Sequence, residues 1–201
     1  MIVWRCLAAG LAASLATKAC GGILLSSSLA WSAFAFRPAN YEDSPNYRAV
    51  GPAFAVGYSY ARAFDGAAYV NYIPGTQKNA KFGKEDAHLL LYGLELALRV
   101  NDAVFLGLRG GVGRYKFIKL NTDFDVPGEW QGNAAGFVLG AIHKVDKHNF
   151  WQLSLLLHHA MLARQLKSPS NGANDLRRID AFSLAVSYTF IGGFSGGRSA
   201  L

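Results

Sequence analysis

The chain has 201 residues, a length that suits one domain, and 51% of them are hydrophobic while only 16% are charged. In a soluble domain, about a quarter of the residues are usually charged. The low charged fraction and the mean hydropathy of +0.14 both argue against a water-facing surface. The excess of 20 Lys and Arg over 13 Asp and Glu gives a net charge of +7, which favours anionic partners. No basic cluster interleaved with aromatic residues occurs, which argues against nucleic acid. Two cysteines, Cys6 and Cys20, cannot build a disulfide framework or a cysteine-based metal site.

The N-terminus has the pattern of a secretory signal, in which Arg5 precedes an apolar run from Cys6 to Ala16 and then small residues. We expect a signal peptide over residues 1–21. An alternative cleavage site follows the Ala33-Phe34-Ala35 pattern, after residue 35. Downstream of residue 40, no stretch has the ~20 apolar residues that a membrane-spanning helix needs. The hydrophobicity lies instead in period-two alternation, which indicates strands.

Alternation and turn residues predict strands at 24–36, 51–63, 67–73, 87–100, 103–119, 130–145, 148–165 and 177–190. Tight turns are predicted at Phe64-Asp65-Gly66, Asn101-Asp102 and Asp146-Lys147. Longer polar connections are predicted at 74–86, 121–129 and 167–175. Short turns that alternate with long loops are typical of outer-membrane barrels, with the short turns on the periplasmic side. Because segment 51–63 would run inward from outside, an earlier strand is needed; this favours segment 24–36 as a strand and cleavage near residue 20.

The last predicted strand shows the alternation most clearly. Its large apolar residues lie on one face and its small or hydroxylic residues on the other: Phe182, Leu184, Val186, Tyr188 and Phe190 against Ser183, Ala185, Ser187 and Thr189. This is what a lipid-facing strand of a membrane barrel needs. The sequence therefore predicts an all-β protein with an eight-stranded antiparallel transmembrane barrel, an up-and-down meander over residues 22–190. A flexible Gly/Ser-rich tail is expected over 191–201.

The alternating strands, the alternating turn lengths and the terminal Tyr188-Thr189-Phe190 resemble the small outer-membrane β-barrels of the OmpA/OmpX type. In that group the last strand ends in an aromatic residue that serves as the assembly signal, whereas here the tail follows it. The resemblance implies a monomer in the bacterial outer membrane of a Gram-negative cell. It implies contact with outer-membrane lipid, lipopolysaccharide and the barrel-assembly machinery. It is architectural and carries little functional content.

Charged residues are predicted on the inward face of the barrel. If Leu94, Leu96 and Leu98 face lipid, Glu95 and Arg99 face the lumen, and Arg109 does so on the next strand. Charge inside a narrow barrel is costly unless it is paired, so we expect a lumenal ion-pair cluster of Glu95, Arg99 and Arg109. An eight-stranded interior is just wide enough for side chains to fill it. This favours a polar, plugged lumen over a narrow pore.

His159 is the one candidate for chemistry on the lipid-facing side. It resembles the histidine of the lipid A 3-O-deacylase family, which uses a His–x–Ser pair on the outside of an eight-stranded barrel and a Glu on the following strand. Here Met161 occupies the serine position and has no hydroxyl to activate, and no Glu follows His159. The interpretation favoured is a histidine at the headgroup interface.

The lysines Lys78, Lys81 and Lys84 of the predicted 74–86 loop are candidates for lipopolysaccharide contact, the alternative being a solvated loop. No pattern for a cofactor or a metal site is present. We therefore expect a porin-like outer-membrane barrel with a structural or surface-interaction role and no enzymatic activity. The alternative is a lipid A-modifying acyl hydrolase with an outer-wall site near His159.

Overall fold

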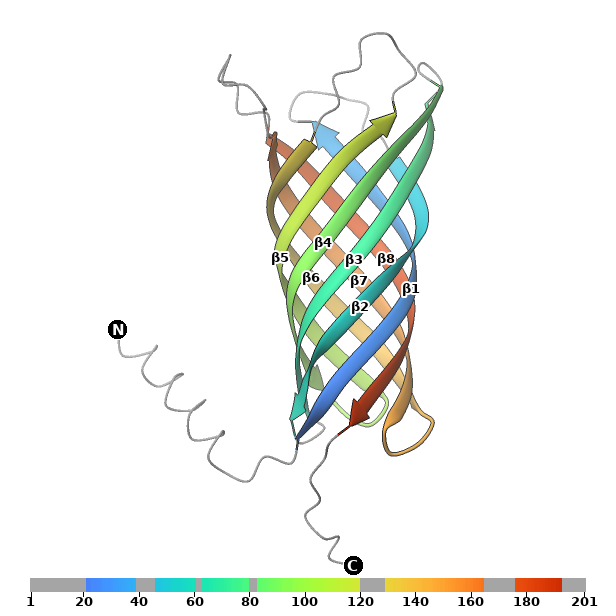
Figure 1. Ribbon diagram of the computed structural model, residues 1–201, viewed down its shortest axis with the longest axis vertical. Coiled ribbons are helices and arrows are strands. Elements are labelled where there is room, and N and C mark those ends of the chain that lie inside the picture. The colour runs from blue at the N-terminus through green and yellow to red at the C-terminus, as the bar shows by residue number, and fades with distance from the viewer. Residues whose placement is uncertain are drawn as a thin grey trace, which may run out of the picture.

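The computed structural model describes residues 21–38, 46–60, 63–79, 83–119, 129–164 and 176–192. These residues form a closed antiparallel barrel of eight strands (Figure 1). The strands are β1 (Gly21–Pro38), β2 (Asn46–Tyr60), β3 (Phe64–Asn79), β4 (Gly83–Arg99), β5 (Val104–Lys119), β6 (Glu129–Lys144), β7 (Asn149–Arg164) and β8 (Leu176–Gly192). Each strand pairs with its neighbours in sequence, and β1 pairs with β8 to close the sheet. The predicted fold class is confirmed.

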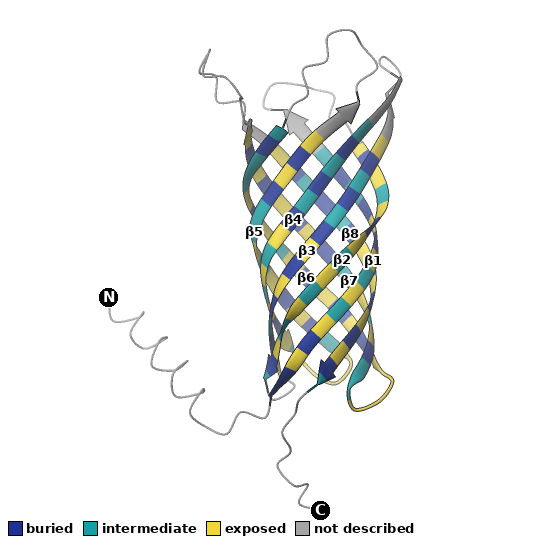
Figure 2. Cartoon of the chain, viewed as in Figure 1, coloured by how far each residue is buried: buried dark blue, intermediate teal, exposed yellow. Residues whose placement is uncertain are grey.

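Exposed and buried residues alternate along every strand, as Figure 2 shows. The exposed set is strongly apolar: Leu94, Leu96 and Leu98 on β4 are 66%, 54% and 54% exposed. Because successive side chains point to opposite faces of a sheet, the other set fills the interior. An apolar wall around a closed barrel is what the hydrocarbon region of a bilayer requires, since closure leaves no unpaired strand edge.

The two ends of the barrel differ in their connections. The end that we call the inner end carries the short connections 61–63, 100–103 and 145–148, and β1 begins and β8 ends there (Figure 1). The other, outer end carries the connections 39–45, 80–82, 120–128 and 165–175. Outward aromatic residues form a belt close to the inner end: Tyr58, Phe64, Trp151, Tyr188 and Phe190. Aromatic girdles of this kind lie at the interfaces of transmembrane barrels.

Strand β1 contains the segment 24–36 that the sequence assigned to the first strand. Its register with β8 brings hydroxyl pairs together inside the barrel, with Ser28 Oγ 2.8 Å from Ser187 Oγ and Ser32 Oγ 2.7 Å from Ser183 Oγ. Cleavage after residue 35 would remove nearly all of β1. The expected signal segment lies outside the described residues except for Gly21, which is the first residue of β1, so cleavage near residue 20 remains a prediction.

The predicted turn at Phe64-Asp65-Gly66 is wrong. These residues begin β3, and the chain reverses over 61–63, where the Ala63 N–H donates to the Tyr60 carbonyl. Asp-Gly is a frequent turn pair, but Asp65 is buried inside the barrel and its carboxylate accepts hydrogen bonds from Arg99. A tertiary ion pair therefore outweighs the local turn preference.

The long connection predicted at 74–86 is also wrong. Strand β3 continues to Asn79 and β4 starts at Gly83, so that only 80–82 lie between them. Proline weakens a strand because it has no N–H to donate. Pro74 is accommodated because the β2–β3 ladder is interrupted between the pairs Arg48↔Thr76 and Ala53↔Asn71.

The last strand extends slightly beyond its predicted end. β8 runs to Gly192, two residues into the expected tail, and Ile191 is fully buried against the inside of the barrel. Its N–H donates to the His148 carbonyl of the neighbouring connection at 2.8 Å. The rest of the expected tail, 193–201, lies outside the described residues.

Candidate functional site

The inward charges form two ion pairs. Arg109 Nε lies 2.5 Å from Glu95 Oε2, because β4 and β5 place these two residues opposite each other. Arg99 Nη2 lies 3.1 Å from Asp65 Oδ2 on β3. The single cluster expected from the sequence is thus divided, since Arg99 meets a carboxylate that had been assigned to a turn.

Each of these arginines also lies over an aromatic ring. The guanidinium carbon of Arg109 is 4.5 Å from the centre of the Tyr69 ring, and that of Arg99 is 5.2 Å from the centre of the Phe150 ring. A cation–π contact of this kind adds to the stability of an ion pair when the cation is withdrawn from water. Both ion pairs are therefore largely withdrawn from water.

The lumen towards the outer end is aromatic, which the sequence reasoning missed. Phe34, Tyr47, Tyr115 and Trp130 come from β1, β2, β5 and β6, and none is more than 6% exposed. The rings of Phe34 and Tyr47 stack at 4.8 Å, those of Tyr115 and Trp130 lie 5.6 Å apart, and Tyr115 Oη donates to Tyr47 Oη at 3.1 Å. We call these four side chains the aromatic cap. The lumen is thus less polar than expected.

The inward position of the aromatic cap residues follows from alternation in the sequence. Phe34 shares the inward face of β1 with Ser32 and Ala30, two positions apart in each case. Gly75 on β3 makes room for the ring, because a Cβ there would lie 2.7 Å from Phe34 Cε1. An inward aromatic residue on one strand beside an inward glycine on another would have indicated the cap. Which residues lie beside each other, however, depends on the register of the strands.

Between the ion pairs and the hydroxyl pairs the lumen retains a small polar cavity. Its volume is about 50 Å³, and its lining includes Glu95, Arg109, Gln152, Ser154 and Ser187. A volume of this size holds a few water molecules. It lies on the inner side of the aromatic cap.

His159 faces outward on β7 and meets a carboxylate that the sequence reasoning missed. Its Nδ1 lies 2.7 Å from Asp180 Oδ1 on β8, where the register sets the two residues opposite each other. A carboxylate only accepts hydrogen bonds, so Nδ1 carries the proton. Arg178 Nε also lies 3.3 Å from Asp180 Oδ2. His158, the neighbouring residue, is buried in the lumen, so the two histidines diverge.

The signal for Asp180 was present in the alternation of the last strand. Asp180 has the same parity as Phe182 and Leu184, so it lies on the outward face. The carboxylate that contacts His159 is thus an Asp on the following strand. Its meeting with His159, however, depends on the β7–β8 register, which alternation does not supply.

Two of the three lysines lie in strands and not in the expected loop. Lys78 and Lys84 lie in β3 and β4 and are paired in register, while Lys81 is outside the described residues. Their contact with lipopolysaccharide stays a prediction. In the described part of the chain, no group of three or more His, Cys, Asp or Glu residues could hold a metal ion. No helix among these residues is long and apolar enough to cross a membrane.

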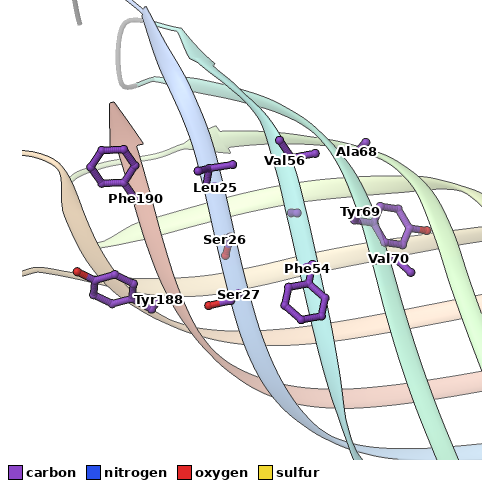
Figure 3. Close-up of a pocket in the computed structure, with 11 residues that line it drawn as sticks. Leu25, Ser26, Ser27, Phe54, Val56, Ala68, Tyr69, Val70, Tyr188 and Phe190 are labelled. Carbon is purple, nitrogen blue, oxygen red and sulfur yellow. The ribbon is translucent and has the colours of Figure 1, made fainter. Parts of the chain in front are cut away.

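The outer wall has a hollow of about 560 Å³ over β8, β1, β2 and β3. Figure 3 shows it between the large side chains of Tyr188, Phe190, Phe54 and Val70, where the smaller Ser27 and Ala68 leave the surface low. None of the residues that line it is charged. It belongs to the lipid-facing wall.

Comparison with protein-family models finds no match, and comparison with curated proteins finds none either. Solved structures do match over most of the chain. Neisserial surface protein A has a TM-score of 0.60 at 11% identity, over 84% of this chain and 96% of that protein. AlkL, solved in lipid bilayers, has a TM-score of 0.53 at 13% identity, over 88% and 92%. Ail of Yersinia pestis has a TM-score of 0.50 at 14% identity, over 84% and 99%.

These likenesses, at such low identities, concern the fold. The fold and the apolar wall together define an outer-membrane β-barrel, the class to which these solved structures belong. The chain is a bacterial outer-membrane protein of the small, eight-stranded type. The short connections and the ends of β1 and β8 then face the periplasm, and the outer end faces the exterior. The resemblance to the OmpA/OmpX type is confirmed at this level, and the likeness to the deacylase family is not.

Proposed function

We propose that this protein has a structural or surface-interaction role and that its lumen is closed to ions and solutes. The observation that carries the proposal is the aromatic cap. Its four rings come from opposite sides of the barrel and contact one another, with exposures of 0–6%. Eight strands leave an interior that side chains can fill, and the buried ion pairs occupy the next part of it.

The interaction role rests on the outer end. Basic side chains lie there on the wall, including Arg48 and Arg178. One neighbour in fold, Ail of Yersinia pestis, was solved in complex with the heparin analogue sucrose octasulfate, a polyanion. A net charge of +7 suits a polyanionic partner in the same way. Lipopolysaccharide, with its phosphates, is the partner that we infer, and Lys78, Lys81 and Lys84 remain candidates for it.

A swelling assay tests the closed lumen. Liposomes that contain the purified protein are placed in an isosmotic solution of a pentose, beside liposomes with a general porin and empty liposomes. We expect swelling at the rate of the empty liposomes, because the sugar finds no path past the cap. Swelling that increases with the amount of folded protein would show an open lumen and would contradict the proposal.

The second candidate function is acyl hydrolysis at the outer wall. It is favoured by the hydrogen bond between His159 Nδ1 and Asp180, since a histidine oriented by a carboxylate can act as a general base on water. It is opposed by Met161, which offers no nucleophile where the resemblance needs a serine. Mass spectrometry of lipid A from cells that express the wild type or His159→Ala decides between them. Our proposal expects identical lipid A, and loss of an acyl chain with the wild type alone would favour the hydrolase.

A further inference from the structure

A groove of about 820 Å³ crosses the outer wall over β6, β7, β8, β1 and β2. The register sets its outward side chains in two rows across these strands. The row nearer the outer end is largely polar, and the next is apolar apart from one arginine: Asn46, Ala35, Asp180, His159 and Ala135, then Arg48, Ala33, Phe182, Leu157 and Phe137. The alanines keep the floor of the groove low. The groove therefore joins a charged edge to an apolar bed.

The charge of this groove is predominantly basic. Asp180 holds Arg178 through Nε and His159 through Nδ1, which leaves the outer guanidinium nitrogens of Arg178 and Nε2 of His159 for a ligand. Arg48 has no hydrogen-bond or ion-pair partner among the residues that the structure describes. By contrast, Arg114 on the opposite wall is paired with Glu129. Among the described residues that line the groove, Asp180 is the one carboxylate, beside Arg48, Arg178 and His159, so the groove complements an anion.

The height of the groove matches the outer headgroup region of a bilayer. Arg48 lies ten residues from Tyr58, and Asp180 lies ten residues from Phe190, both members of the inner aromatic belt. Ten strand residues span about 33 Å, and a strand tilt of about 40° reduces the rise to about 25 Å. The apolar band of an outer-membrane barrel is about 25 Å tall. The charged edge therefore lies where lipid phosphates begin, while the uncharged hollow of Figure 3 lies beside the belt.

We propose that this groove binds a phosphate-bearing lipid of the outer leaflet. Arg48 and Arg178 contact the phosphate from two sides, because a guanidinium matches phosphate oxygens with parallel N–H donors. With its Nδ1 held by Asp180, His159 has Nε2 left to contact the same group. An acyl chain lies along Phe137, Leu157 and Phe182. The proposal extends the surface-interaction role, and its failure would leave the closed lumen untouched.

Native mass spectrometry of the detergent-solubilised protein tests this binding, with diphosphoryl lipid A and dephosphorylated lipid A as the probes. We expect the wild type to bind the diphosphoryl form at least about tenfold more tightly than Arg48→Ala/Arg178→Ala does, the size of a lost charged hydrogen bond. The dephosphorylated form is expected to bind the wild type no better than the diphosphoryl form binds this variant.

The matched control is Arg114→Ala/Lys116→Ala, which removes the same charge from the outward face of β5 on the other side of the barrel. It is expected to bind as the wild type does. The proposal would be overturned if the wild type and Arg48→Ala/Arg178→Ala bound diphosphoryl lipid A equally well. It would also be overturned if the control lost as much affinity as that variant, or if the wild type bound both forms of lipid A equally well. If the double variant does not fold, as judged by its heat-modifiable gel mobility, Arg48→Gln replaces it, and unchanged affinity in that variant would have the same consequence.

Discussion

The pair between Glu95 and Arg109 shows how a buried residue depends on its partner. Their side chains are 15% and 10% exposed, and the guanidinium has an aromatic face on its other side. Removing one partner of a buried pair leaves the other charge in a medium that solvates it poorly. We expect Glu95→Ala to destabilise the barrel by roughly 3–5 kcal/mol, measured as the free energy of unfolding in urea from lipid vesicles.

The double variant Glu95→Ala/Arg109→Met is the control for this prediction. It removes both charges and keeps apolar bulk, so most of the lost stability should return. Arg99 and Asp65 form the other pair and are unaffected. An unchanged unfolding free energy for Glu95→Ala would mean that this ion pair does not stabilise the barrel.

Asp146 lies in the periplasmic connection 145–148, where its Oδ1 accepts the N–H groups of His148 at 2.7 Å and Asn149 at 2.9 Å. The pKa of Asp146 lies below its ordinary value of 3.8. The largest cause is the hydrogen bond from the His148 N–H, followed by the one from the Asn149 side chain. The bonds favour the carboxylate, so their contribution to stability is present above 3.8 and is lost as the pH falls through the folded-state pKa.

A carbon-detected NMR titration of the Asp146 carboxyl group is expected to give a midpoint below 3.8. In Asp146→Asn the amide oxygen can still accept the two backbone bonds, but no proton is taken up there. The acid dependence of unfolding should therefore be weaker in that variant. A midpoint at or above the ordinary value would mean that the bonds are not made in solution.

At the scale of the strand, neighbouring glycines of β5 have opposite surroundings. A Cβ on Gly111 would lie 2.1 Å from the Tyr92 carbonyl oxygen of β4, whereas a Cβ on Gly110 would meet nothing within 4 Å. The first faces the crowded interior and the second faces outward. Backbone atoms cannot yield as a flexible side chain can.

We therefore expect Gly111→Ala to push β4 and β5 apart and to cost about 1–3 kcal/mol of stability, the usual size of overpacking. Gly110→Ala changes the same residue type one position away and should be close to neutral. Unfolding free energies of the two variants, measured side by side, check this. Equal stabilities would contradict the close approach of the two strands at Gly111.

The strands show why alternation predicts elements better than their ends. The segments 87–100 and 103–119 closely match β4 and β5, because Asn101 and Asp102 form a turn with no competing partner. Strand β3 was predicted only over 67–73, because Asp65-Gly66 and Pro74 are local turn signals. Both signals were overridden by contacts with other strands, and such contacts are not visible in the local sequence.

At the scale of the whole molecule, patterns that run along the whole sequence predicted the barrel. Low charge, alternating strands and alternating connection lengths lead to eight strands, with 24–36 as the strand that closes the ring. The candidate sites were less predictable, because each is made by register. Asp180 meets His159, and Asp65 meets Arg99, only once neighbouring strands are aligned.

The aromatic cap has the same origin. Phe34, Tyr47, Tyr115 and Trp130 are far apart in the sequence, and they contact one another because barrel closure brings β1 and β2 across from β5 and β6. In the proposed function, the cap and the buried ion pairs close the lumen. The activities of this protein are thus expected on its outer wall and at its outer end.

The measurement that tests this account most directly is the ionic current through single molecules of the folded protein in a planar lipid bilayer. A general porin serves as the positive control, and heat-denatured protein as the negative one. A closed lumen predicts no unitary current steps beyond those of the denatured control. Steps of one reproducible size that appear with insertion of the folded protein would show that ions pass the aromatic cap, and the protein would then be a narrow pore.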